Sequence, residues 1–189
     1  MEKRLFIGIK IIPSLKFINL FKDLRQLFPG SGIKWVSPDN IHLTLKFLGQ
    51  TEISKIEEIE DIIRNTIETL LPFELVIKNI GYFPGNKKIN VIWLGTDKNE
   101  TIFKLADLLE EKLFKAGFKK DEHSFNPHIT LARIKPGENA EKLTDFIHKH
   151  KVVCIQTSFV KEIILFESNL TQKGPVYIPV MVFSLKKAT

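Results

Sequence analysis

A four-residue phrase, histidine–apolar–threonine–apolar, occurs twice in this chain of 189 residues. It reads HLTL at residues 42–45 and HITL at residues 128–131, so the two copies begin 86 residues apart. The strands predicted to begin at Arg4 and Asn90 have the same separation, and so do the helices predicted to begin near residues 52 and 138. A constant offset across three elements predicts a duplicated unit of strand, helix, motif strand, helix and strand.

Hydrophobic spacing assigns the remaining elements. Apolar residues recur at helical intervals in four segments and alternate as in strands in most of the rest, with Gly and Pro marking the breaks. The predicted helices cover residues 14–28, 51–71, 98–116 and 138–150. The predicted strands cover residues 4–10, 33–36, 41–48, 73–83, 90–96, 124–134, 152–168 and 176–185.

This element order predicts an α+β fold. We expect residues 1–189 to form a single bilobal domain of two pseudo-symmetric lobes, each with an antiparallel sheet and flanking helices, around a central cleft. The motif strands should face each other across that cleft. Alternation of elements is common in α+β chains and would explain their order, but it does not explain identical motifs at the same offset.

Composition narrows the possible partners and compartments. The chain carries 28 basic and 22 acidic residues, a net charge of +6, and this mild excess favours an anionic partner such as nucleic acid as much as an ordinary soluble protein. The lone cysteine, Cys154, excludes an internal disulfide or a multi-cysteine metal site, and its apolar surroundings indicate a small core residue. The N-terminal stretch has no small-residue cleavage site and no segment is long enough to span a bilayer, so we expect a soluble, cytoplasmic protein.

The repeated phrase has a chemical interpretation. Residues i and i+2 of a strand point to the same face, so each copy presents one imidazole and one hydroxyl while its apolar residues pack behind. Two imidazoles can serve as one base and one acid near neutral pH, and two hydroxyls can donate to phosphoryl oxygens. No metal is needed, and a 2′,3′-cyclic phosphate at an RNA end is a suitable substrate. The alternative is that each histidine only caps or pins its strand.

Several stretches resemble the 2H phosphoesterase superfamily, and in particular the RNA 2′,3′-cyclic phosphodiesterases, historically called 2′-5′ RNA ligases. They are RLFIGIKI, WVSPDNIHLTLKFLG, GYFP, VIWLG, FNPHITLAR and ESNLTQKGPVY, which together span nearly the whole chain. The resemblance implies His42, Thr44, His128 and Thr130 as catalytic residues, a two-lobed α+β fold and metal-independent chemistry without a cofactor.

The resemblance also implies a reaction and a partner. The expected reaction is hydrolysis of a terminal 2′,3′-cyclic phosphate to a 2′-phosphate, with 2′-5′ ligation as its possible reverse. The expected partner is RNA with such ends, for example tRNA halves or short oligonucleotides. Either histidine could be the base, and we favour His128 as the base and His42 as the acid. We expect a monomer, because one chain supplies both half-sites.

Three residues near the motifs have two predicted roles each. Phe47 and Arg133 both stand five residues after their histidine, and strict alternation would turn them away from it. The family pattern has the arginine here, so a bulge could return both residues to the site, where they would bind the terminal base or phosphate. Otherwise Phe47 is a core residue and Arg133 a surface ion-pair partner. Lys46 shares the predicted face of His42 and would either attract the RNA backbone or lie solvated at an edge.

Other candidates are weaker. Tyr177 either lines the cleft or is an ordinary aromatic at the start of a strand. His148 and His150 could ligate a metal, although histidines at a basic helix terminus also complement the helix dipole. His123 should be exposed. The same site could instead act on a 2′-5′ oligoadenylate, a cyclic nucleotide or an ADP-ribose cyclic phosphate, or the fold could bind RNA or nucleotides without turnover. Loops 84–89 and 168–176 would help to choose among these substrates.

Overall fold

One antiparallel sheet organises the computed structural model, which describes residues 1–29, 32–84, 89–135, 145–147, 154–172 and 174–186. In the described residues the sheet has nine strands in the order β7-β4-β5-β6-β3-β1-β8-β9, with β2 also paired to β6. The strands are β1 (Glu2–Lys10), β2 (Ile33–Trp35), β3 (His42–Glu52), β4 (Phe73–Pro84), β5 (Ile89–Thr96), β6 (His128–Ile134), β7 (Cys154–Val160), β8 (Glu162–Thr171) and β9 (Gly174–Ser184).

The order of the sheet is symmetric about its centre. On one side of the join between β3 and β6 the strands run β6-β5-β4-β7, and on the other they run β3-β1-β8-β9. Strands β3 and β6 are joined at a single residue pair, Leu43 with Ile129, so the sheet divides there into two lobes. The predicted α+β fold with two lobes is therefore confirmed.

Three α-helices are described in full. They are α1 (Leu15–Leu27), α2 (Ile56–Ile67) and α3 (Glu100–Lys115), and two short 3-10 turns cover Pro38–Asn40 and Ile53–Lys55. The Ser14 hydroxyl caps α1 and the Asn99 side chain caps α3, each accepting a backbone N–H three residues on. Helix α2 instead depends on burial of Ile59, Ile63 and Ile67, which the i, i+4 spacing places on one stripe.

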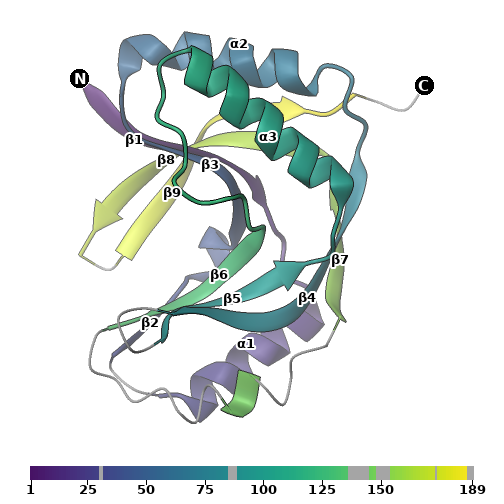
Figure 1. Cartoon of the computed structure of the whole chain (residues 1–189). Coiled ribbons are helices and arrows are strands. Elements are labelled where there is room, and N and C mark those ends of the chain that lie inside the picture. The colour runs from purple at the N-terminus through teal and green to yellow at the C-terminus, as the bar shows by residue number, and fades with distance from the viewer. Residues whose placement is uncertain (30–31, 85–88, 136–144, 148–153, 173, 187–189) are drawn as a thin grey trace.

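The helices cross between the two lobes (Figure 1). Helix α1 follows β1 along the chain but packs against β7 of the other lobe. Helix α3 follows β5 but packs beside α2 and against β3. Each lobe therefore has its apolar face covered partly by a helix that follows a strand of the other lobe. The helix-free faces of the two lobes, here called the inner face, carry the motif histidines.

The second half departs from the predicted elements in one place. The strand predicted over residues 152–168 is two strands that break at Lys161, where the chain passes from β4 on one lobe to β1 on the other. Only residues 145–147 of the helix predicted over 138–150 are described, and they are helical. The duplicated unit stays a prediction that the symmetric sheet order supports.

Cys154 is not a core residue, contrary to the prediction. It is exposed at the first position of β7, an edge strand in which Ile155 and Val160 face the core. An apolar run at an edge buries only one face, and Cys154 lies on the other. No helix in the described part of the chain is long and apolar enough to cross a membrane.

Candidate active site

The two motifs lie side by side at the centre of the sheet. His42 is the first residue of β3 and His128 is the first residue of β6. Since Leu43 pairs with Ile129 in antiparallel register, His42 comes opposite Thr130 and Thr44 comes opposite His128. Leu43 and Ile129 are fully buried in the main core, so the histidines and threonines share the inner face. The structure thus brings the four predicted catalytic residues together, on neighbouring strands of one sheet.

Both imidazoles are held in the same way. The Nδ1 of His42 is 2.6 Å from the carbonyl oxygen of Asn40, and the Nδ1 of His128 is 2.8 Å from that of Asn126. A carbonyl only accepts, so each Nδ1 carries the hydrogen and each neutral ring keeps its lone pair on Nε2. These asparagines were missed from the sequence, although both stand two residues before their histidine.

Thr44 is in contact with the reactive nitrogen of its own histidine. Its Oγ1 lies 3.1 Å from Nε2 of His42. With the ring neutral, the hydroxyl donates to Nε2, and with the ring charged, Nε2–H donates to the hydroxyl. The hydroxyl therefore accommodates either protonation state, as a site that takes up and releases protons requires.

Burial keeps both imidazoles neutral. It lowers the pKa of His42 below the ordinary value, and the positive charges of His128 and Arg133 lower this pKa further, while the hydrogen bond to Asn40 raises it. Burial also lowers the pKa of His128, with a smaller lowering from Arg133 against a rise from the bond to Asn126. Near pH 7 the free protein thus presents two proton-accepting rings.

A register shift in β3 decides which face each residue after the motif occupies. Gly8 of β1 pairs with Thr44, and Ile7 pairs with Lys46, so Leu45 has no partner in the register. The extra residue reverses the alternation, as in a β-bulge. Leu45 and Lys46 both become buried, and Phe47 is 43% exposed on the side of His42.

The second motif strand has the same irregularity 86 residues later. Trp93 of β5 pairs with Thr130, and Ile92 pairs with Ala132, which leaves Leu131 without a partner in the register. Leu131 and Ala132 are both buried, and Arg133 returns to the exposed side. The predicted alternative of a bulge is therefore confirmed for both strands.

Neither prediction for Lys46 was correct. Its side chain is 2% exposed, and Nζ lies 2.6 Å from a carboxylate oxygen of Glu110, 3.0 Å from one of Asp121 and 2.9 Å from the carbonyl oxygen of Lys119. These contacts, here called the buried lysine triad, join β3 to the end of α3 and the loop after it. Lys46 faces the core because the bulge at Leu45 turned it there.

Arg133 acts electrostatically on the whole site. Its positive charge lowers the pKa of His42 and of His128, and it also opposes the rise in the pKa of Tyr177 that burial causes. The bulge at Leu131 returns Arg133 to the exposed side of β6, the strand that begins at His128. Arg133 is thus placed to attract an anion to the two imidazoles.

Aromatic rings enclose His42 more fully than His128. The ring centroids of Phe6 and Tyr177 lie 4.9 and 4.8 Å from that of His42. One ring, Phe83, contacts His128 edge-on at 4.8 Å. Tyr177 therefore lines the site, which is one of the two roles predicted for it. Phe6 and Phe83 were not identified from the sequence, although Phe6 alternates with Arg4 in β1.

Phe47 already has a cation beside it. The Arg4 guanidinium carbon lies 4.9 Å from the centroid of the Phe47 ring. Arg4 was overlooked in the sequence because it stands outside both motifs. It adds a second positive charge to the inner face and acts on Tyr177 as Arg133 does.

The histidines outside the motifs form no metal site in the described residues. No group of three His, Cys, Asp or Glu side chains in that part of the chain could hold a metal ion. His148 and His150 lie outside the described residues. His123 is exposed, as predicted.

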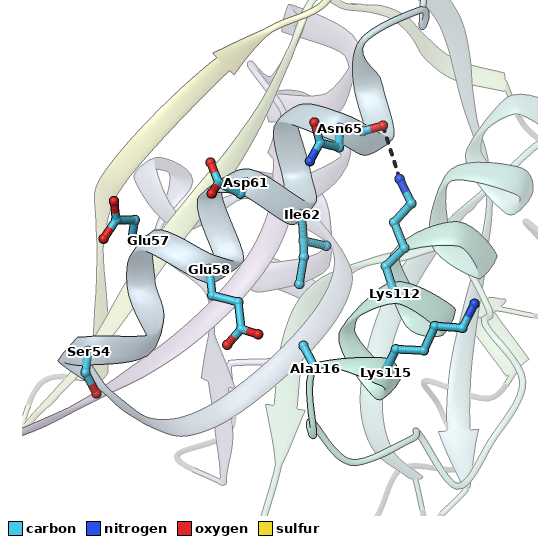
Figure 2. Close-up of a pocket in the computed structure, with 9 residues that line it drawn as sticks. All are labelled: Ser54, Glu57, Glu58, Asp61, Ile62, Asn65, Lys112, Lys115 and Ala116. Carbon is cyan, nitrogen blue, oxygen red and sulfur yellow. Dashed lines mark hydrogen bonds between the residues drawn. The ribbon is translucent and has the colours of Figure 1, made fainter.

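One hollow among the described residues lies away from the histidines. It measures about 680 Å³ and opens between helices α2 and α3, on the face of the sheet opposite the histidines (Figure 2). Glu57, Glu58 and Asp61 of α2 and Lys112 and Lys115 of α3 are among the residues that line it, and Lys112 Nζ donates to the carbonyl oxygen of Asn65. Charged helix surfaces of this kind are usually solvated, so the inner face is the better candidate site.

The chain is similar to known proteins over nearly its whole length. The family model described as LigT like phosphoesterase matches the chain twice, over residues 12–93 and 94–177. The RNA 2′,3′-cyclic phosphodiesterase of Methanothermobacter thermautotrophicus is 37% identical over 186 residues, which is 98% of this chain and 100% of the relative. The enzyme of the same name from Methanocaldococcus jannaschii is 37% identical over 92% of this chain and 96% of its own.

Solved structures show the same fold. The crystal structure of TT0787 from Thermus thermophilus superposes with a TM-score of 0.78 at 25% identity, over 96% of this chain and 97% of that one. Escherichia coli LigT complexed with 3′-AMP superposes with the same TM-score at 23% identity, over 99% and 100% of the two chains.

Proposed function

The chain belongs to the LigT-like phosphoesterase family, and on this basis we propose that it is an RNA 2′,3′-cyclic phosphodiesterase that opens terminal cyclic phosphates to 2′-phosphates. The observation that carries the proposal is the pair of imidazoles on neighbouring strands, each held through Nδ1 by the carbonyl two residues before it. Two such rings provide one proton acceptor and one proton donor without a metal.

Binding of the substrate favours the protonated state of one of the two imidazoles. A cyclic phosphodiester carries one negative charge, and a negative charge beside an imidazole raises its pKa. In the free protein burial keeps both rings neutral, so binding of the phosphate favours uptake of one proton. Arg133 supplies the fixed positive charge that attracts the phosphate first, and the hydroxyls of Thr44 and Thr130 donate to its non-bridging oxygens.

Exposure supports the assignment of the base. His42 lies between Phe6 and Tyr177, whereas His128 has contact with a single ring and lies closer to solvent. The attacking water comes from solvent, so His128 is the proposed base and His42 the proposed acid. This agrees with the preference stated from the sequence.

The proposed step is balanced. His128 takes a proton from water at Nε2 while the water oxygen bonds to phosphorus. The bond between phosphorus and the ribose 3′ oxygen breaks, and His42 gives its Nε2 proton to that oxygen. The product is a 2′-phosphate beside a 3′-hydroxyl. His128 then releases its proton to solvent and His42 takes one up, so both rings return to their starting states. If the 5′-hydroxyl of another RNA attacks phosphorus in place of water, the same bond to the 3′ oxygen breaks and a 2′-5′ linkage forms, but dilute solution favours hydrolysis.

Substrate and setting are part of the proposal. The RNA would be tRNA halves or short oligonucleotides with cyclic phosphate ends, acted on by a monomer, because a single chain supplies both histidines. The proposed location is the cytoplasm. Phe47, exposed beside Arg4, would contact the terminal nucleotide together with Arg133.

The test is incubation of the protein in EDTA with a short RNA that ends in a 2′,3′-cyclic phosphate, with the product end read by phosphorus NMR. We expect a 2′-phosphate, and its loss in His42→Ala and in His128→Ala. A 3′-phosphate would show that the 2′ oxygen leaves instead, and activity that survives both substitutions would disprove the two-histidine mechanism. No turnover by the wild-type chain would exclude this substrate.

A further inference from the structure

Two cations stand opposite each other on the inner face, Lys34 of β2 and Arg133 of β6. Their Cα atoms are register partners where these antiparallel strands run side by side, and such partners project to the same face of a sheet (Figure 1). That face is the inner one, because the next residue of β2, Trp35, packs edge-on against Phe21 of α1 with ring centroids 5.5 Å apart. Lys34 and Arg133 are both exposed.

A third cation extends this pair along β6. Lys135 follows Arg133 by two residues, and its backbone N–H donates to the carbonyl oxygen of Gly32 at 2.8 Å, so the ladder between the strands continues to it. Strand alternation places Lys135 on the same face as Arg133, and Lys135 is also exposed. Two residues of a strand span roughly 7 Å, which is close to the separation of consecutive phosphates in an RNA strand. Lys34, Arg133 and Lys135 are here called the basic row.

No carboxylate neutralises the basic row within the described residues. The ion pairs of that part of the chain lie elsewhere, and their cations are Lys3, Lys46, Lys55, Lys104 and Lys115. Like charges directly opposite each other on neighbouring strands are destabilising. The pair of Lys34 and Arg133 therefore does not stabilise the free protein, and an anion bound between them would relieve their repulsion.

The basic row starts close to the catalytic residues. Arg133 and His128 belong to the same strand, and the positive charge of Arg133 lowers the pKa of both catalytic histidines. Toward β1 and β9 the surroundings of His42 are instead aromatic, with Phe6 and Tyr177 in contact with its ring. A polyanion that extends from the two imidazoles thus meets rings in one direction and several cations in the other. Its favoured path is along β6 and β2.

We propose that Lys34 and Lys135 bind the phosphodiester that precedes the terminal nucleotide, while Arg133 stays with the cyclic phosphate. This inference rests on the proposed function. It identifies the favoured substrates as RNA ends of two or more nucleotides, since a cyclic mononucleotide has no second phosphate to bind. Contacts to phosphate carry no information about the bases, so the preference should depend on the length of the RNA and not on its sequence.

The first experiment compares three substrates: adenosine 2′,3′-cyclic phosphate, the dinucleotide ApA with the same cyclic end, and that dinucleotide with an uncharged methylphosphonate linkage. We expect Lys34→Met to raise KM for the charged dinucleotide roughly 2- to 5-fold, as the loss of one exposed ion pair does. KM for the other two substrates should stay at the wild-type value. Lys104→Met, which removes an exposed lysine of α3, should change none of the three.

Three results would overturn the proposal. One is an unchanged KM for the charged dinucleotide in Lys34→Met. Another is an equal rise for all three substrates, together with a lower melting temperature, because Lys34 would then have a structural role. The last is a selective rise in Arg4→Met instead of Lys34→Met, because the RNA would then extend over the other lobe.

A binding measurement keeps this test separate from the proposed reaction. Its probe is a labelled RNA trinucleotide that ends in a 2′-phosphate, followed by fluorescence anisotropy at several salt concentrations. The slope of log Kd against log salt should be smaller by about 0.7 in Lys34→Met, the contribution of one phosphate contact on a single strand. This change without turnover of any cyclic phosphate would refute the proposed function and leave the subsite standing. Turnover with equal slopes in Lys34→Met and the wild type would refute the subsite alone.

Discussion

Replacement of Lys46 by methionine tests whether the buried lysine triad stabilises β3 in its shifted register. The ammonium group has three N–H donors, and the structure gives it three acceptors: Glu110, Asp121 and the carbonyl of Lys119. Methionine fills most of the same volume without the charge. The substitution therefore removes three hydrogen bonds, two of them to carboxylates, and keeps the apolar packing of the stem.

The loss of stability depends on how much water can reach the carboxylates of Glu110 and Asp121 once Lys46 is replaced. A hydrogen bond to a charged group contributes about 1.5–3 kcal/mol, and loss of one partner of a fully buried pair costs about 3–5 kcal/mol. Here the side chains of Glu110 and Asp121 are 26% and 52% exposed, so water can replace part of what they lose. We expect Lys46→Met to lower the free energy of unfolding by about 1–3 kcal/mol. Lys46→Ala should cost roughly 2 kcal/mol more, because about three further CH₂-sized groups leave the core.

The assay is urea unfolding, with Lys104→Met as the matched control. Lys104 also pairs with a glutamate, Glu100, but its side chain is 75% exposed, so its loss should change stability by less than about 0.5 kcal/mol. The salt dependence of KM for a cyclic-phosphate RNA should be the same in Lys46→Met and in the wild type. Equal stabilities of the two methionine variants, with a weaker salt dependence for Lys46→Met, would mean that Lys46 contacts RNA and that our account of the triad is wrong.

Three further predictions concern the inner face. The depressed pKa values of His42 and His128 mean that unfolding takes up protons below the ordinary value of 6.5, so the free energy of unfolding should fall as pH drops through 6.5 toward 5. Urea unfolding at pH 7.5 and 5.5 should show this loss, and the double alanine variant of the two histidines should reduce it. Gly8→Ala should destabilise the fold by about 1–3 kcal/mol, because its Cβ would be 2.7 Å from the backbone oxygen of Leu43; a melting temperature equal to that of the wild type would contradict this. Arg133→Ala should weaken turnover of a cyclic-phosphate dinucleotide and shift the acidic limb of its pH–rate profile to higher pH, since a positive charge that lowers both histidine pKa values is gone. Full activity would exclude Arg133 from the site.

The repeated phrase predicted more of this molecule than any local propensity. Its identical spacing indicated the lobes, and the strand period placed each histidine with its threonine. Both results depend only on the two motifs and on the distance between them along the chain. The faces of Lys46 and Phe47 could not be read in the same way, because the pairing with β1 skips Leu45 and so reverses the alternation that a sequence pattern assumes.

Residues that depend on a neighbouring strand were the ones missed. The indole of Trp93 lies against Gly81 of the neighbouring strand β4, where a Cβ would be 2.3 Å from a ring carbon. The break between β7 and β8 at Lys161 occurs because the chain crosses there from one lobe to the other. The apolar run itself contains no residue that predicts this break. Asn40 and Asn126 contribute through their backbone carbonyls. Every residue type has such a carbonyl, so the sequence gives no signal for this contact.

The crossing of α1 and α3 between the lobes has a consequence for how the chain folds. Each half of the sequence lacks a helix that its own sheet needs, because α1 packs on β7 and α3 on β3. A fragment cut after β4 would leave an uncovered apolar sheet, so separate halves should be insoluble alone and gain structure only when mixed. Many contacts must then form between distant parts of the chain, and such contacts slow folding. We therefore expect the two lobes to unfold together in one transition.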